Sequence, residues 1–111
     1  MDISEKVDDR GLLLVLAGKL DAQSSPPTQE RLLGVIERGE KKVLLDLAGV
    51  DYVNSAGLRV FMIAAKKVKA TGGKLAISGM TPNVRELFDI AGFLPLIPIY
   101  STRDEAFAAL Q

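Results

Sequence analysis

Two short polar segments of the sequence carry the side chains best suited to chemistry. One is Gly18–Ser25, which contains Asp21, and the other is Asp51–Leu58, which contains Asn54 and Ser55. Each follows an apolar run that predicts a buried strand. In open α/β sheets, functional groups gather where the carboxyl ends of strands meet helix N-termini. We therefore expect both segments at one functional end of a sheet.

Ser55 is expected just before or within the first turn of a helix that carries Leu58. Its hydroxyl could cap that helix, as Ser and Asn residues before helices commonly do, and it is expected to project from a surface loop within reach of a kinase. A phosphate there would face unpaired backbone N–H groups and the positive end of the helix dipole. Phosphorylation would then leave the fold nearly intact while adding about −1.5 to −2 charge to a docking surface. Gly57 has two readings as well, a turn or packing glycine or part of the site.

Missing residue types exclude several kinds of enzyme. The chain has no cysteine and no histidine, so it lacks a thiol nucleophile, thiolate metal ligands and the commonest general base. Neither glycine-rich nucleotide signature occurs. Asp21, Asp46 and Asp51 could converge and hold a divalent cation, although carboxylates scattered over loops are usually caps and turn formers. We expect no catalytic residue, no cofactor and no metal, and rank a metal-assisted hydrolase below a binding protein.

The charges balance, with 14 basic and 14 acidic residues. A neutral chain lacks the electrostatic footprint of proteins that bind nucleic acid or anionic membranes. No apolar run is long enough to span a bilayer, and the start, Met1–Lys6, is polar where a signal peptide would be basic and then apolar. We therefore expect a cytoplasmic protein with no nucleic-acid partner and no membrane insertion. The basic residues Arg59, Lys66, Lys67 and Lys69 form either a solvated face or a docking surface for an acidic partner.

Hydrophobic patterning predicts a single α/β domain over residues 1–111, with elements in the order β-β-α-β-α-β-α-β-α and a largely parallel sheet opened by one antiparallel hairpin. The expected strands are Ile3–Val7, Leu12–Leu16, Val43–Leu47, Leu75–Ile77 and Leu96–Ile99, the last at an edge because it contains Pro98. The expected helices begin near Ser25-Pro26-Pro27, after a loop at Ala48–Asn54, at Thr81-Pro82 and at the capping box Thr102–Glu105. In each helix the apolar residues at helical spacing should face the core: Leu32, Val35 and Ile36 in the first, Leu58, Phe61, Met62 and Ala65 in the second, Val84, Leu87, Phe88 and Ala91 in the third, and Phe107 and Leu110 in the last. The first three helices should end at Gly39, Gly72-Gly73 and Gly92.

A series of short motifs, in order along nearly the whole chain, resembles the STAS family, and most of all its stand-alone anti-sigma factor antagonists. The motifs are Leu20-Asp21, Ser24-Ser25-Pro26, Val43–Leu47, Asn54-Ser55-Ala56-Gly57-Leu58, Gly72-Gly73 and Leu87–Gly92. The Ser-Ala-Gly-Leu block is the most specific of them. The resemblance implies a STAS fold.

The resemblance also implies a mechanism. In such antagonists the unphosphorylated protein binds an anti-sigma factor, usually also a serine kinase, and so releases the sigma factor. The kinase ends binding by phosphorylating the serine that Ser55 matches, and a phosphatase restores it. Asp21 matches an acidic residue near the phosphorylated segment, and Asn54, Ala56, Gly57, Leu58 and Arg59 would belong to the partner surface. Phosphorylated members commonly have Asp where this chain has Asn54.

A second hypothesis keeps the STAS fold without the kinase. The same surface would then dock on a membrane lipid transporter or on another signalling complex, and Asn54 is compatible with this use. The sequence leaves the partner and the pathway open.

Overall fold

The computed structural model describes residues 1–92 and 97–111 of the chain. Its elements follow the expected order: β1 (Asp2–Asp8), β2 (Gly11–Leu20), α1 (Ser25–Glu37), β3 (Lys42–Val53), α2 (Ser55–Ala70), β4 (Lys74–Ser78), α3 (Pro82–Ile90), β5 (Ile99–Tyr100) and α4 (Arg103–Leu110). None of the described helices is long and apolar enough to cross a membrane.

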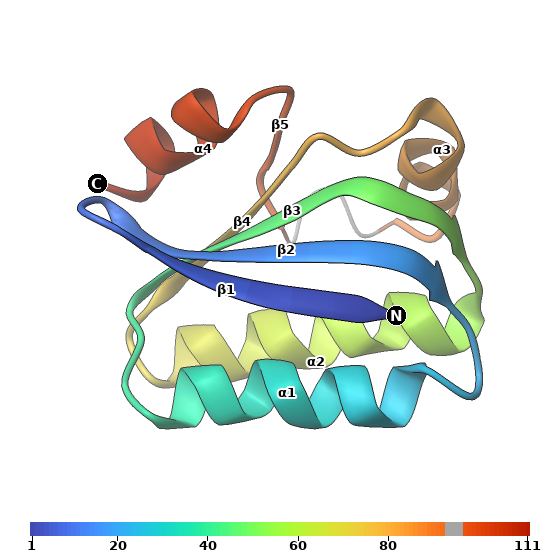
Figure 1. The fold of residues 1–111 in the computed structure, drawn as a ribbon, viewed down its shortest axis with the longest axis horizontal. Helices are drawn as coiled ribbons and strands as arrows, with labels where there is room; N and C mark the ends of the chain where they lie inside the picture. Colours follow the sequence, from blue (N-terminus) through green and yellow to red (C-terminus); the bar gives the residue numbers. More distant parts are fainter. Residues whose placement is uncertain (93–96) are drawn as a thin grey trace.

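The five strands form one mixed sheet in the order β1-β2-β3-β4-β5 (Figure 1). β1 and β2 form the antiparallel hairpin, and the remaining pairs are parallel. Because each parallel neighbour needs a crossover connection, a helix follows β2, β3 and β4 in turn. The carboxyl ends of these strands therefore lie at one edge of the molecule, as the order of elements predicts.

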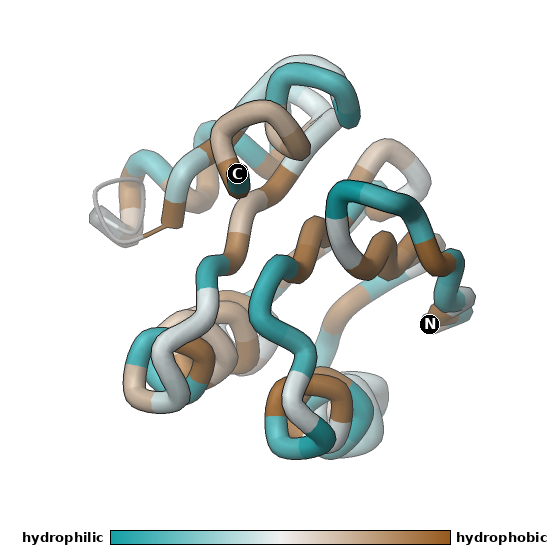
Figure 2. Tube along the Cα trace, turned by 90° about the vertical axis from the view of Figure 1, so that its left-hand side faces the viewer, coloured by the Kyte–Doolittle hydropathy of each residue, from teal (hydrophilic) through white to brown (hydrophobic). Residues whose placement is uncertain are grey.

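Helices cover both faces of the sheet, with α1 and α2 on one side and α4 on the other (Figure 1). In β2, Leu12, Leu14 and Leu16 belong to the larger core cluster, whereas Leu13 belongs to a smaller cluster with residues of α4. Successive strand residues face opposite sides, so the apolar run in β2 is buried on both faces, as expected. Figure 2 shows the hydrophobic strands lying between α4 and the pair of helices opposite it.

α3 closes the end of the larger core. Val84 and Phe88 are fully buried, and the ring of Phe88 lies against that of Phe61 from α2 with the centroids 5.4 Å apart. Thr81 caps the helix by accepting a hydrogen bond from the Val84 N–H. α3 is therefore anchored through one face and carries Ile90, 77% exposed, at its end.

α4 is held on the opposite face by charged contacts as well as by packing. Arg103 donates to the buried carboxylate of Asp46 in β3 at 2.7 and 2.6 Å. Arg10, in the β1–β2 turn, pairs with Asp104 and lies 4.5 Å above the ring of Phe107. The expected cap is present, because the Thr102 hydroxyl accepts the Glu105 N–H. α4 thus links the hairpin to the middle of the sheet.

Three predicted boundaries are wrong for the same reason. β2, expected to end at Leu16, continues to Leu20 and pairs with β3. β3 therefore runs on to Val53, and most of the loop expected at Ala48–Asn54 is strand. β5 begins at Ile99 instead of Leu96; Leu96 lies outside the described residues, and β5 is an edge strand as expected. Strand pairing set these limits, and pairing is not visible in a single stretch of sequence.

The predicted core-facing set of α2 is confirmed for Phe61, which is fully buried, and for Leu58 and Ala65, which pack half-buried against the larger core. The fully buried residues are Gly57, Val60, Phe61, Ala64 and Val68, whereas Leu58, Met62 and Ala65 are half-buried. Phe61 is shared between the two sets.

Truncating the ring in α3 tests this packing. We expect Phe88→Ala to lower the free energy of unfolding by about 3–5 kcal/mol, because it removes a buried ring and leaves a cavity. Ile90→Ala, on the exposed side of the same helix, should change it by less than about 0.5 kcal/mol. Urea unfolding followed by circular dichroism measures both, and equal effects would contradict the assigned core.

Candidate functional site

The two polar segments singled out from the sequence lie side by side at the carboxyl ends of β2 and β3. Leu20 and Val53 are register partners at the end of this parallel pair. Asn54, the residue directly after β3, donates its N–H to the Leu20 carbonyl at 3.1 Å. The chain leaves β2 into the segment containing Asp21 and leaves β3 directly into α2, so both segments share one edge.

Asn54 caps α2, and Ser55 does not. The Asn54 Oδ1 accepts the Gly57 N–H at 3.1 Å, and its carbonyl accepts the Leu58 N–H at 3.0 Å. Ser55 is the first residue of the helix and is exposed. Within residues 1–92 and 97–111 its hydroxyl makes no hydrogen bond. The expected position at the start of the helix is confirmed, whereas the expected cap and surface loop are not: Asn54 is the cap, and Ser55 presents its free hydroxyl from the first turn itself.

Gly57 is required by close packing of the first turn of α2 on the end of β2. A Cβ at this position would lie 2.8 Å from both the Leu20 Cγ and the Leu20 carbonyl oxygen, and 2.9 Å from a methyl carbon of Val53. Gly57 has ordinary helical geometry, so its role is closeness of approach rather than an unusual backbone angle. The packing explanation for this glycine therefore holds, and the contact fixes the height of Ser55 above the sheet edge.

Asp21 organises the turn between β2 and α1. Its Oδ1 accepts the N–H groups of Gln23 and Ser24 at 3.0 and 3.1 Å. The Ser24 hydroxyl in turn donates to the Lys19 carbonyl at 2.8 Å. Hydrogen bonding from the Ser24 backbone, more than any other contact, lowers the pKa of Asp21. The carboxylate is therefore charged at neutral pH and holds the turn beside Asn54.

A largely apolar groove of about 600 Å³ runs between the first turns of α1 and α2. Ala56, Arg59 and Val60 line it from α2, and Ser25 and Leu33 are among the residues that line it from α1. Ser25, predicted as a helix cap, lies inside α1 and is 5% exposed, and its hydroxyl has no hydrogen-bond partner in the described parts of the chain. Sequence reasoning did not identify this groove, because it depends on how two helices pack.

The three aspartates considered for a metal site do not converge. Asp46 lies on the α4 side of the sheet, where it accepts from Arg103 and from the Ala48 N–H at 2.9 Å. Asp51 is exposed on β3. The described residues contain no group of three acidic side chains placed to hold a metal ion. What the edge offers is an exposed serine at the start of α2, beside the turn that Asp21 holds.

The comparisons with known proteins agree with this architecture. The sequence model of the STAS domain matches residues 2–106. BtrV of Bordetella bronchiseptica is named provisionally as an anti-sigma factor antagonist. It is 36% identical to this chain over 107 residues, which make up 96% of this chain and 91% of BtrV. The anti-sigma-B factor antagonist of Bacillus subtilis is 31% identical over 99 residues, 89% and 90% of the two chains. The chain belongs to the STAS domain family.

Solved structures share the fold at lower identity. An anti-sigma factor antagonist from Mycobacterium paratuberculosis superposes with a TM-score of 0.89 at 20% identity, covering 98% of this chain and 92% of that one. The Bacillus cell fate determinant SpoIIAA in its phosphorylated form gives a TM-score of 0.75 at 17% identity, covering 99% and 100%. The expected STAS fold is confirmed.

Adding a methyl group at Gly57 tests the contact that positions the site. Alanine is favoured over glycine within a helix by about 1 kcal/mol, but here the methyl group would collide with the Leu20 backbone. We expect Gly57→Ala to lower the free energy of unfolding by about 1–2 kcal/mol, since overpacking outweighs helix propensity. Gly34→Ala is the matched control in α1, where nothing lies within 4 Å of the added carbon, and it should raise stability by about 0.5–1 kcal/mol. Stabilisation by both substitutions would contradict the close approach.

The Asp21 turn gives a prediction about pH. Because its folded-state pKa is lowered, the carboxylate contributes stability that is present above the unfolded-state pKa of about 3.9 and is lost as the pH falls through the folded value. We expect the Asp21 carboxyl carbon to titrate at a lower pH in the folded protein than in urea. The Gln23 and Ser24 amide signals should shift with the same midpoint in an NMR titration, and an Asp21 midpoint equal to that in urea would contradict the bonding described here.

Proposed function

We propose that this protein is an anti-sigma factor antagonist that binds an anti-sigma factor and thereby releases a sigma factor. Membership of the STAS family and the names of relatives that span nearly the whole chain support this function. The described edge has a free hydroxyl and a docking surface, but no nucleophile–base pair of the kind an enzyme needs. Partner binding, and not catalysis, is the activity that such an edge supports.

The switch is phosphorylation of Ser55 by a serine kinase, which is also the anti-sigma factor, and removal of the phosphate by a phosphatase. One observation carries this proposal: Ser55 is exposed at the first residue of α2, and Asn54 already provides the cap. The hydroxyl can therefore be modified without removing a bond that the fold uses. A phosphate at a helix N-terminus is electrostatically favourable, so the modified protein stays folded while its surface charge changes.

Asn54 replaces the aspartate that phosphorylated relatives commonly carry. Its amide oxygen performs the capping role through the Gly57 N–H, so the substitution changes charge and leaves the geometry of the first turn intact. We infer that the kinase which recognises this chain does not require a carboxylate immediately before the serine. The phosphate, in turn, would have one fewer negative neighbour.

The docking surface comprises Asp21 and the segment Asn54–Arg59, with exposed Arg59 and half-buried Ala56 and Leu58 at its centre. Its mixture of apolar and charged side chains is typical of transient protein interfaces. Sigma factors act on transcription in the bacterial cytoplasm, and we place the protein there.

Three baits test the switch: the wild type, Ser55→Ala and Ser55→Asp, each used in a pull-down from native lysate read by mass spectrometry. We expect the wild type and Ser55→Ala to capture a kinase-like anti-sigma factor, and Ser55→Asp to bind the purified factor at least tenfold more weakly by calorimetry. The melting temperature of Ser55→Asp should stay within about 2 °C of the wild type, because no structural bond is lost. Equal binding by all three proteins, or capture of membrane transporter subunits alone, would overturn the proposal.

A further inference from the structure

The strand β1 forms a long, open edge of the sheet. It lies outermost in the strand order, and its pairing with β2 runs without a bulge from Asp2–Ala17 to Asp8–Gly11. In Figure 1, β1 lies at the front and no other element crosses it. The opposite edge, β5, has two residues and directly follows Pro98, which has no N–H to offer. A straight edge of the length of β1 is a template on which a further strand can pair.

Alternate residues of β1 turn their backbone groups away from β2. Partners in an antiparallel pair alternate between hydrogen-bonded and non-hydrogen-bonded positions. Asp8 and Gly11 flank the two-residue turn and are a bonded pair, so the bonded positions of β1 are its even-numbered residues. The N–H and C=O groups of Ile3, Glu5 and Val7 therefore point outward, where the part of the chain that the structure describes supplies no partner strand. The side chain of Val7 is also 93% exposed.

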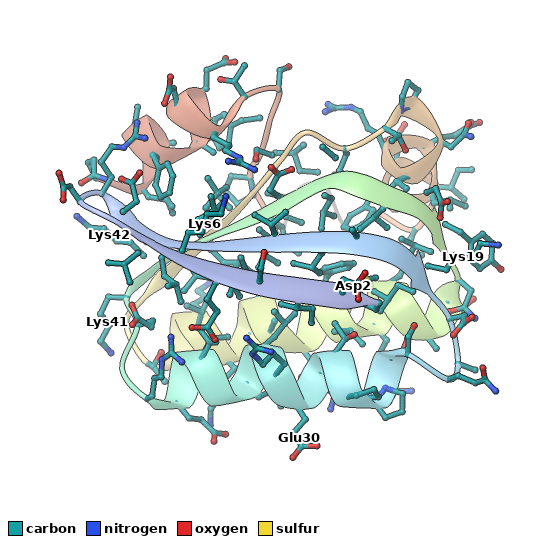
Figure 3. All side chains as sticks on the ribbon, viewed as in Figure 1. Asp2, Lys6, Lys19, Glu30, Lys41 and Lys42 are labelled. Carbon is teal, nitrogen blue, oxygen red and sulfur yellow. The ribbon has the colours of Figure 1, made fainter. Side chains whose placement is uncertain are left out.

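Asp2 and Lys6 give this edge charges of both signs. Both side chains are exposed, and they lie on the same face of β1 because they are an even number of residues apart. Figure 3 shows them towards opposite ends of the strand, and neither forms an ion pair with any residue in the ranges 1–92 and 97–111. Glu5, on the other face, is held by Arg31 and Arg38 of α1. The face opposite α1 thus presents one acid and one base, four residues apart.

Antiparallel pairing of β1 with β1 of a second copy matches these charges in one register. With Ser4 opposite Ser4, Asp2 of each copy lies opposite Lys6 of the other copy. These are non-hydrogen-bonded positions, where side chains on opposite strands approach most closely and opposite charges stabilise the pair. The same register places Ile3 opposite Glu5, so the outward N–H and C=O groups of both residues bond across the edge.

Other registers lose this match. Outward-facing residues must stay opposite one another, so the strands can slide only in steps of two residues. Sliding one way places Glu5 opposite Glu5 and Asp2 opposite Asp8, and like charges directly opposite are destabilising. Sliding the other way places Asp2 opposite Ser4 and takes it away from Lys6. Lysine on an edge strand commonly prevents pairing with other chains, but here an antiparallel copy of the same strand supplies its counter-charge. Charge complementarity therefore favours a second copy over an unrelated strand.

We propose that β1 is a self-association surface, through which two copies of this protein pair antiparallel about a two-fold axis at Ser4 and form one continuous sheet. The interface is isologous, since both copies use the same residues. A strand pair buries a small area, so the dimer is weak and reversible. The segment Asn54–Arg59 is not part of β1, and the dimer presents it twice, pointing in opposite directions. A partner with two matching sites would bind such a dimer with a gain in avidity.

Charge reversal tests the register. Asp2→Lys places lysine opposite lysine, and Lys6→Asp places aspartate opposite aspartate. We expect each variant to raise the dimer dissociation constant by at least about tenfold in analytical ultracentrifugation. An equal mixture of the two variants restores opposite charges at every position, so it should recover the wild-type affinity as a heterodimer. The matched control is Lys66→Asp, which makes the same charge change at an exposed position of α2 and should leave the dissociation constant unchanged.

Amide hydrogen exchange locates the interface. The amides of Ile3 and Glu5 should exchange more slowly when the wild type is concentrated enough to dimerise, whereas those of Ser4 and Lys6, bonded to β2, should be protected at every concentration. A wild type that is still monomeric at about 1 mM, single variants that dimerise as tightly as the wild type, or a mixture that does not recover would overturn the proposal. So would a dimer in which Ile3 and Glu5 stay unprotected, or protection that appears only when a different protein binds. None of these results bears on the antagonist function, which rests on other residues.

Discussion

The close approach of α2 to the end of β2 is the constraint on which the rest of the site depends. Because Gly57 has no side chain, the first turn of α2 lies closer to the Leu20 backbone than a larger residue would allow. The Asn54 N–H is hydrogen-bonded to the Leu20 carbonyl. Because β2 and β3 are paired up to this point, the turn held by Asp21 and the first turn of α2 become one surface. Gly57 thus lets two segments about thirty residues apart in sequence lie together at one edge of the sheet.

The hydrogen bonding at this edge leaves room for a modification of Ser55 that removes no structural contact. Asn54 provides the helix cap, so the hydroxyl of Ser55 is left outside the bonding that stabilises α2. The buried contacts that hold the domain together lie elsewhere, in the two hydrophobic clusters and in the pair of Arg103 with Asp46 on the opposite face. Charge can therefore change at Ser55 while the core stays the same.

Much of the fold could be predicted because the local signals agree with one another. The double-sided apolar run in β2, the cap at Thr81 and the cap at Thr102 all produced the expected elements. Errors arose where pairing between distant segments extends an element, as in β3 beyond Leu47. Asp46 was grouped with Asp21 and Asp51 from sequence, yet its side chain lies on the far face with Arg103, because neighbouring strand residues point to opposite sides.

The sequence by itself determined the α/β order, the absence of histidine and cysteine chemistry, and the block Asn54–Leu58 that resembles the STAS antagonists. These follow from local composition, periodicity and spacing, which need no knowledge of distant contacts. Only the tertiary structure decided that Asn54 rather than Ser55 caps α2, that Gly57 is fixed by the Leu20 backbone, and that Ser25 and Arg59 line one groove. Such features depend on where two helices and two strands meet in space, and that meeting is set by packing and hydrogen bonding between residues far apart in the chain.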